Sequence, residues 1–120
     1  MDIGMNAFIS KLFEARQQAH VMHLRTNSYE VHMALDTFYN EILGLIDDLA
    51  ETFMGQYGQI RDYSPIIIKD IDPIVYLEGL ANILKDFPTL NTGKDSHLQN
   101  IVDEITGLTF RTLYKLKYLK

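Results

Sequence analysis

The 120-residue chain contains no cysteine. A disulfide framework, a zinc site built on thiolates and a cysteine nucleophile are therefore excluded. The sequence also lacks a glycine-rich phosphate loop and a Gly-x-Ser-x-Gly nucleophile elbow, so neither phosphate-loop chemistry nor nucleophilic hydrolysis is expected. Candidate chemistry must come from histidine and carboxylate side chains.

Long apolar runs are missing as well. No stretch approaches the roughly 20 apolar residues that a membrane-spanning helix requires. The opening Met-Asp-Ile-Gly lacks the basic and apolar regions of a secretory signal peptide. We therefore expect no membrane partner and a cytoplasmic location.

Positive charge is scarce, since 11 Lys and Arg residues face 16 Asp and Glu residues and the net charge is −5. Binding to nucleic acid depends on cations that neutralise phosphates, so a nucleic-acid partner is not expected. The cations concentrate only near the C-terminus, at Arg111, Lys115, Lys117 and Lys120. We interpret them as complementing the negative end of a last helix, with a small patch for an anionic partner as the alternative.

Apolar residues recur at steps of three and four along most of the chain, which predicts amphipathic helices. The first helix is expected over 3–24. A second should begin after the cap residues of 26–28, with Asn27 and Glu30 forming a capping box, and should end at the glycines of 55–58. A third is expected from 73 to about 87, with Asp72 as its cap and Pro73 in its first position, and a fourth from Asp95 or Ser96 to the C-terminus.

The stretch from Gly58 to Pro73 is apolar, contains Pro65 and lacks a helical period. We expect it to pack across the domain as a long crossover, and we expect a loop at 89–96. The sequence therefore predicts an all-α four-helix bundle formed by a single domain, 1–120. One long crossover between the second and third helices is the ferritin-like topology.

Polar residues of the second helix gather on one side. On a helical wheel, His32, Asp36, Asp47 and Glu51 share an arc of about 100°. At the end of the first helix, His20 and His23 lie one turn apart and can face the start of the second. Imidazole and carboxylate together suit iron, manganese or zinc, although a solvated polar stripe on an amphipathic helix is the simpler interpretation.

Distance limits what one chain can bind. Asp36 and Asp47 are separated by about 16 Å along a helix, so the residues of this arc cannot all bind one ion. One chain therefore supplies half of a site.

The pattern resembles a known family. The chain has His-x-x-His-Leu at 20–24, followed by His32, Asp36 and then Asp47 with Ala50-Glu51. This series is similar to the signature of Dps-type mini-ferritins. In that family a ferroxidase centre lies between two subunits. The resemblance implies that one chain supplies His32 and Asp36 and its two-fold mate supplies Asp47 and Glu51. Either His20 or His23 would be the first ligand.

A second resemblance covers nearly the whole chain. It rests on three segments, HLRTNSYEVHMAL, GQYGQI and DSHLQNIVDEI. These segments are similar to sequences of small, mostly phage-encoded Dps-like proteins. In a phage-encoded protein the location would be the host cytoplasm or the virion. The sequence departs from Dps proteins in four ways. Tryptophan is absent after the second histidine, Thr52 replaces arginine after the glutamate, no basic tail precedes the first helix, and we expect no short helix in the connection between the second and third helices.

These observations lead to two hypotheses. The first is a Dps-like homo-oligomer, at least a two-fold dimer with a larger ring or cage as the alternative, that binds one or two iron ions between subunits. It would oxidise Fe(II) with O₂ or peroxide and store the product, and zinc or manganese are alternative metals. The second hypothesis is a non-catalytic helical protein, such as a virion or host-interaction component, that retains a vestigial metal site.

Overall fold

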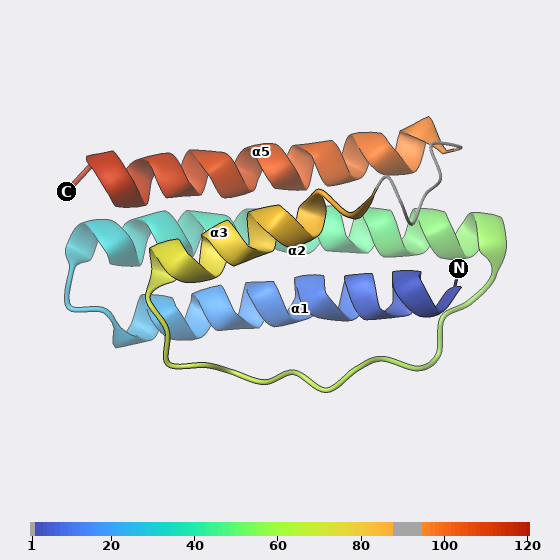
Figure 1. Ribbon diagram of the computed structural model, residues 1–120, viewed down its shortest axis with the longest axis horizontal. Coiled ribbons are helices and arrows are strands. Elements are labelled where there is room, and N and C mark those ends of the chain that lie inside the picture. Colours follow the sequence, from blue (N-terminus) through green and yellow to red (C-terminus); the bar gives the residue numbers. More distant parts are fainter. Residues whose placement is uncertain (1, 88–94) are drawn as a thin grey trace.

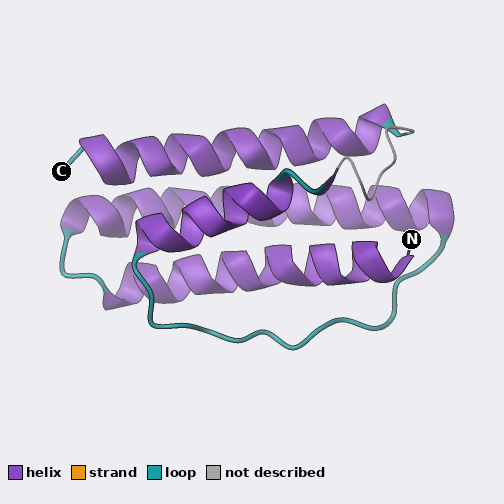
Figure 2. Ribbon diagram, viewed as in Figure 1, coloured by secondary structure: helices purple, strands orange, loops and turns teal. Residues whose placement is uncertain are grey.

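A computed structural model of the chain describes residues 2–87 and 95–120. In these residues the chain forms helices and no strand (Figure 2). The four helices of this part are α1 (Asp2–Arg25), α2 (Tyr29–Tyr57), α3 (Pro73–Leu84) and α5 (Ser96–Tyr118) (Figure 1). The prediction of an all-α protein is confirmed for the described residues.

The helices lie roughly side by side in a body of 43 × 26 × 20 Å (Figure 1). α2 packs between α1 and α5, and α3 packs against α5. Their apolar stripes meet in one core, as the periodicity predicts. The largest fully buried side chains of this core are Ile9, Leu12, Leu35, Phe38, Ile42, Ile46, Leu49, Leu77, Leu80, Phe87, Leu98 and Ile105.

The turn between α1 and α2 is capped differently from the prediction. Ser28 is the N-cap of α2, and its hydroxyl accepts a hydrogen bond from the backbone N–H of Val31. The predicted capping box of Asn27 and Glu30 is therefore wrong: the cap lies one residue later, and Val31 stands where a capping box needs Glu or Gln. The reason is local: Thr26 accepts a bond from the Ser28 N–H, which fixes Ser28 in the extended conformation that a cap requires.

The start of α3 follows the prediction. The Asp72 side chain accepts bonds from the N–H groups of Ile74 and Val75, and Pro73 occupies the first turn. The helix ends at Leu84, about three residues earlier than predicted. Most of the loop predicted at 89–96 lies outside the described residues.

The fifteen residues between α2 and α3, 58–72, contain no helix and run along α1 (Figure 1). Three side chains of α1, one turn apart, bind the backbone of this crossover. Ser10 accepts a bond from the N–H of residue 64, Glu14 from that of residue 67, and Gln18 from that of residue 69. The Gln18 amide also donates to the carbonyl of residue 69 at 2.9 Å. The crossover is thus held by side chains instead of by a backbone ladder.

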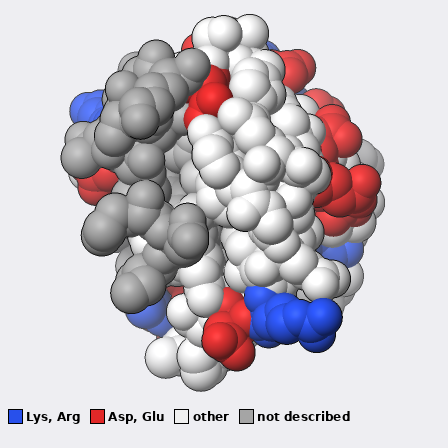
Figure 3. Space-filling model, turned by 90° about the vertical axis from the view of Figure 1, so that its right-hand side faces the viewer, with Lys and Arg blue, Asp and Glu red and all other residues white. Residues whose placement is uncertain are grey.

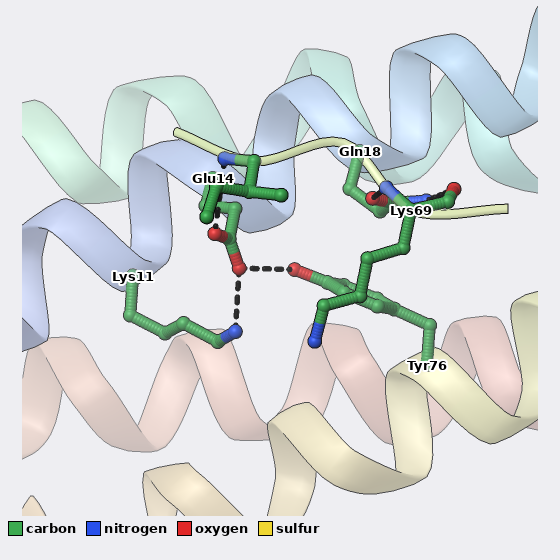
Figure 4. A network of polar contacts seen from close by, with 6 residues as sticks. Lys11, Glu14, Gln18, Lys69 and Tyr76 are labelled. Carbon is green, nitrogen blue, oxygen red and sulfur yellow. Dashed lines mark hydrogen bonds and ion pairs between the residues drawn. The ribbon is translucent and has the colours of Figure 1, made fainter. Parts of the chain in front are cut away.

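Glu14 is the centre of a buried polar network beneath the crossover (Figure 4). Its carboxylate pairs with Lys11 and accepts a 3.4 Å bond from the Tyr76 hydroxyl of α3. Burial tends to raise the pKa of Glu14, but the Lys11 hydrogen bond, the Ile67 N–H and the charges of Lys11 and Lys69 outweigh it and lower the pKa. Burial and the neighbouring Glu14 charge hold the pKa of Tyr76 far above its usual range, so the phenol stays neutral.

A second polar network joins the end of α2 to the start of α5. Gln56 donates to one carboxylate oxygen of Asp95 and Tyr57 donates to the other, while His97 bonds the Gln56 carbonyl oxygen at 2.7 Å. This network holds the start of α5 at Ser96, in agreement with the predicted start at Asp95 or Ser96.

None of the helices in the described ranges 2–87 and 95–120 is long and apolar enough to cross a membrane.

Candidate metal centre

The geometry of the candidate site begins with two histidines that face each other across the α1–α2 turn. Nδ1 of His23 lies 2.7 Å from the carbonyl oxygen of His32, and Nδ1 of His32 lies 2.8 Å from the carbonyl oxygen of His23. The two rings are stacked, with centroids 3.6 Å apart and planes inclined by 18°. His23 is buried, whereas His32 is half-buried.

These bonds decide which ring nitrogen carries the proton. A carbonyl oxygen only accepts hydrogen bonds, so each Nδ1 must be the N–H donor. In the neutral ring, Nε2 then holds a lone pair, which is the arrangement that metal-ligating histidines usually adopt. Because the two rings are almost parallel, their in-plane lone pairs do not converge on one ion.

His20 and Tyr39 extend the cluster along the α1–α2 contact. Their rings are stacked at 4.1 Å with an angle of 11°, and the edge of Tyr39 approaches His23 at 5.2 Å. The guanidinium of Arg16 lies 5.6 Å from the Tyr39 ring centre, within range of a cation–π contact. The three predicted histidines therefore lie together in one row of rings.

Asp36 lies beside this row, one turn after His32. Desolvation, together with the hydrogen bond and the charge of Asp36, raises the pKa of the Tyr39 phenol. Asn40 donates to an Asp36 carboxylate oxygen at 3.3 Å. Asp36 is thus positioned by two neighbouring side chains.

The chain does not bring Asp47 and Glu51 to the histidines. Both are exposed on the second half of α2, and about 16 Å of helix separates Asp47 from Asp36. Across residues 2–87 and 95–120, no three His, Asp or Glu side chains are placed to hold one metal ion. A site that uses both halves of α2 needs a second chain.

Tyr39 and Arg16 were not anticipated from the sequence as members of the cluster. A signal was present, since Tyr39 follows His32 by seven residues and Arg16 precedes His20 by four, both of which are same-face spacings. This spacing indicates a shared face but not a metal site, because arginine has no lone pair to offer a metal and the Tyr39 phenol is neutral.

Comparison with known proteins places the chain in a family. Residues 23–116 match the family of unknown function DUF5856. The chain belongs to this family. The matched region contains His23, His32, Asp36, Asp47 and Glu51, and it excludes His20.

The chain is also similar to a protein of Enterobacteria phage T4, described as an uncharacterized 14.6 kDa protein in the mobD-ri intergenic region. The two are 31% identical over 119 residues, which cover 91% of this chain and 84% of the phage protein. No solved structure matches the chain significantly. Because neither relationship names an activity, a functional argument must rest on the site itself.

Proposed function

We propose that this protein is a Dps-like, metal-binding homo-oligomer that oxidises Fe(II) at a site shared by two antiparallel copies. The observation that carries the proposal is the His23–His32 pair, whose Nδ1 atoms are both engaged by backbone carbonyls. Their Nε2 lone pairs are left for a metal. Partly exposed His20 and Asp36 lie at the same surface.

The spacing along α2 supports a shared site. His32 precedes Asp36 by four residues, and Asp47 precedes Glu51 by four. When two α2 helices lie antiparallel across a two-fold axis between residues 41 and 42, His32 faces Glu51 of the mate and Asp36 faces Asp47 of the mate in the same register. The same antiparallel arrangement of two α2 helices therefore brings together both residue pairs, His32 with Glu51 of the mate and Asp36 with Asp47 of the mate.

Exposed apolar residues lie on the same side of α2. Tyr29, Met33 and Leu43 fall within the ~100° arc that contains the candidate ligands. Their exposed fractions are 70%, 42% and 38%. Packing against a mate would remove this apolar surface from water, which is favourable by about 25 cal/mol per Å².

The donor set suits the proposed chemistry. Neutral imidazole and carboxylate ligands bind iron, manganese and zinc, and the negative carboxylates compensate the added charge when Fe(II) becomes Fe(III). Oxygen or peroxide would accept the electrons. The stacked histidines favour two neighbouring ions over one, since each ring directs its lone pair separately. Zinc or manganese could occupy the same ligands without oxidation, and an iron product could be retained as stored ferric ion.

The test is anaerobic loading with Fe(II), followed by exposure to air and measurement of ferric-oxo absorbance. His32→Ala and Glu51→Ala should each abolish the signal. Glu30→Ala and His97→Ala are matched controls, because they remove an exposed glutamate and a histidine outside the site, and they should leave the signal unchanged. Wild-type protein that binds no iron, manganese or zinc would refute the proposal.

Mixing the two inactive variants tests whether the site is shared. A dimer of one His32→Ala chain and one Glu51→Ala chain contains one site with both residues intact and one with both missing. After random reassociation, about a quarter of the sites should recover. If the site were formed within one chain, the mixture would recover no ferric-oxo absorbance.

A second candidate function is a helical assembly or interaction protein without turnover. The exposed aromatic residues of α5 favour it, because large exposed aromatic side chains are typical of interfaces. Protein that forms a defined assembly but binds no metal would support this alternative.

A further inference from the structure

The outward side of α5 is divided by charge. Its N-terminal half exposes Asp103 and Glu104, and its C-terminal half exposes Arg111. The side chains of residues 111–120 include four cations and no Asp or Glu, whereas those of the rest of the chain include seven cations and 16 Asp and Glu, so the side-chain charges of the two parts are +4 and −9. On the outward side of α5, acidic side chains thus lie in the N-terminal half and basic side chains in the C-terminal half.

Aromatic side chains accompany the basic half. Phe110, Tyr114 and Tyr118 follow one another at four-residue steps, with exposed fractions of 51%, 56% and 72%. The rings of Tyr114 and Tyr118 lie 5.8 Å apart. Exposed aromatic residues next to arginine are the side chains that most often dominate the energy of protein interfaces.

The acidic half borders a groove between α2 and α5. The groove has a volume of about 360 Å³ and is lined by Glu41, Leu45, Asp103, Glu104, Gly107 and Arg111. Gly107 has no side chain, and a Cβ placed there would lie 3.1 Å from Nη1 of Arg111. The Arg111 side chain therefore extends over Gly107, toward the acidic half. Seen along the helices from the end where α2 finishes, acidic atoms gather on the right-hand side of the molecule (Figure 3).

We propose that this α5 face, defined as Asp103, Glu104, Gly107, Arg111, Tyr114 and Tyr118, binds the α5 face of a second copy in antiparallel orientation. A two-fold axis that crosses α5 midway between Glu104 and Arg111 brings the acidic half of each α5 helix against the basic half of the other. Such a contact is self-complementary, since each residue pair occurs twice. Parallel docking would instead oppose like charges.

The α5 face differs from the surface proposed to share the metal site. That surface is the side of α2 next to α1, and α5 packs on another side of α2. Lys117 does not belong to the α5 face, because it forms a 3.0 Å ion pair with Glu78 on α3. One chain therefore presents two separate surfaces to other copies, and an assembly larger than a dimer follows when both are used.

Charge reversal tests the contact. Glu104→Lys and Arg111→Glu should each oppose like charges at two places in the pair and raise its dissociation constant at least about tenfold. Mixed together, the two variants should associate again, because the lysine introduced in one chain then faces the glutamate introduced in the other, and the native Arg111 faces the native Glu104. The measurement is solution mass by sedimentation velocity or native mass spectrometry, at low and high salt. Salt should weaken the wild-type contact.

The matched controls are Asp62→Lys and Arg61→Glu, which make the same charge changes on the exposed crossover. They should keep the wild-type mass, alone and when mixed. The proposal is overturned if both α5 variants also keep the wild-type mass, or if their mixture fails to restore an association that each variant has lost.

The same samples separate this contact from the proposed metal site. Glu104→Lys and Arg111→Glu chains should still bind metal, because the α1–α2 surface is unchanged. His32→Ala chains should lose metal and keep the α5 contact. Loss of metal binding in the α5 variants would show that the two surfaces are not independent and would overturn their assignment as separate contacts.

Discussion

His23 and His32 each donate a ring N–H to the backbone carbonyl of the other, at 2.7 and 2.8 Å. The pair joins the last turn of α1 to the first turn of α2. His23 is buried, and its replacement removes one of the two side-chain bonds between these helices. The cluster is therefore structural as well as a candidate ligand set.

Replacement of His23 by leucine should lower the free energy of unfolding by about 0.5–1.5 kcal/mol, the usual net contribution of one intramolecular hydrogen bond. Urea unfolding followed by circular dichroism measures this change. His20→Leu is the control, since His20 is half-buried and stacks on Tyr39, and it should cost less. Equal losses for the two variants would contradict the structural role of the paired bonds.

Replacement of Gln18 by leucine should loosen the crossover. Gln18 is fully buried and makes two bonds to the backbone of residue 69, so the expected loss is about 1–3 kcal/mol. Limited proteolysis should also become faster within 58–72. The neighbouring Gln17→Leu, which leaves these bonds intact, should have little effect on either measurement. An unchanged cleavage rate for Gln18→Leu would show that other contacts hold the crossover.

The lowered pKa of Glu14 predicts how the free energy of unfolding depends on pH. Its folded-state pKa lies below the ordinary value of 4.5, so its ionised form stabilises the fold above that pH. This contribution disappears as the pH falls through the folded-state pKa. The difference in unfolding free energy between wild type and Glu14→Gln should therefore be largest near neutrality and should shrink below about pH 4.5.

Unfolding curves for wild type and Glu14→Gln between pH 7 and pH 3 provide that measurement. Glu30→Gln, at an exposed position, is the matched control and should show little pH-dependent difference from wild type. A Glu14→Gln difference that stays constant over this range would mean that the Glu14 carboxyl has no lowered pKa.

Gly107→Ala should act in opposite directions on folding and on association. Glycine inside a helix costs roughly 0.5–1 kcal/mol relative to alanine, so the variant should unfold at higher urea concentration. The added methyl lies 3.1 Å from the Arg111 guanidinium, which must move, so self-association through the α5 face should weaken. Gly79→Ala on α3 has open space around its Cβ and should stabilise the helix without affecting association.

Helix positions were predictable from local information. The expected first helix, 3–24, agrees with Asp2–Arg25 to one residue at each end, and Asp72 and Pro73 marked the start of α3. The apolar spacing also placed Leu35, Phe38 and Ile42 in the core. Within α3, Val75 is 55% exposed, whereas the next two residues, Tyr76 and Leu77, are buried.

The buried polar groups of α1 were not predictable in this way. Ser10, Glu14 and Gln18 look like the wet side of an amphipathic helix, yet all three are buried by the crossover. Their partners lie more than 50 residues away in the sequence, at 64, 67 and 69. The grouping of His20, His23 and His32 was predictable because one short turn joins their helices, whereas the metal and the contribution of a second chain stay predictions.

The side-chain anchoring of the crossover has a consequence for how the polypeptide can be divided. Residues 63, 66 and 67 carry Tyr and Ile side chains with 44%, 46% and 64% exposure, and no helix hydrogen bond would be broken by cutting the chain there. The fragment ending there would keep the α1–α2 pair, and the other would keep α3 with α5, while α2 and α5 pack against each other in one hydrophobic core. The molecule is therefore suited to splitting into two separately expressed pieces that reassemble through that contact.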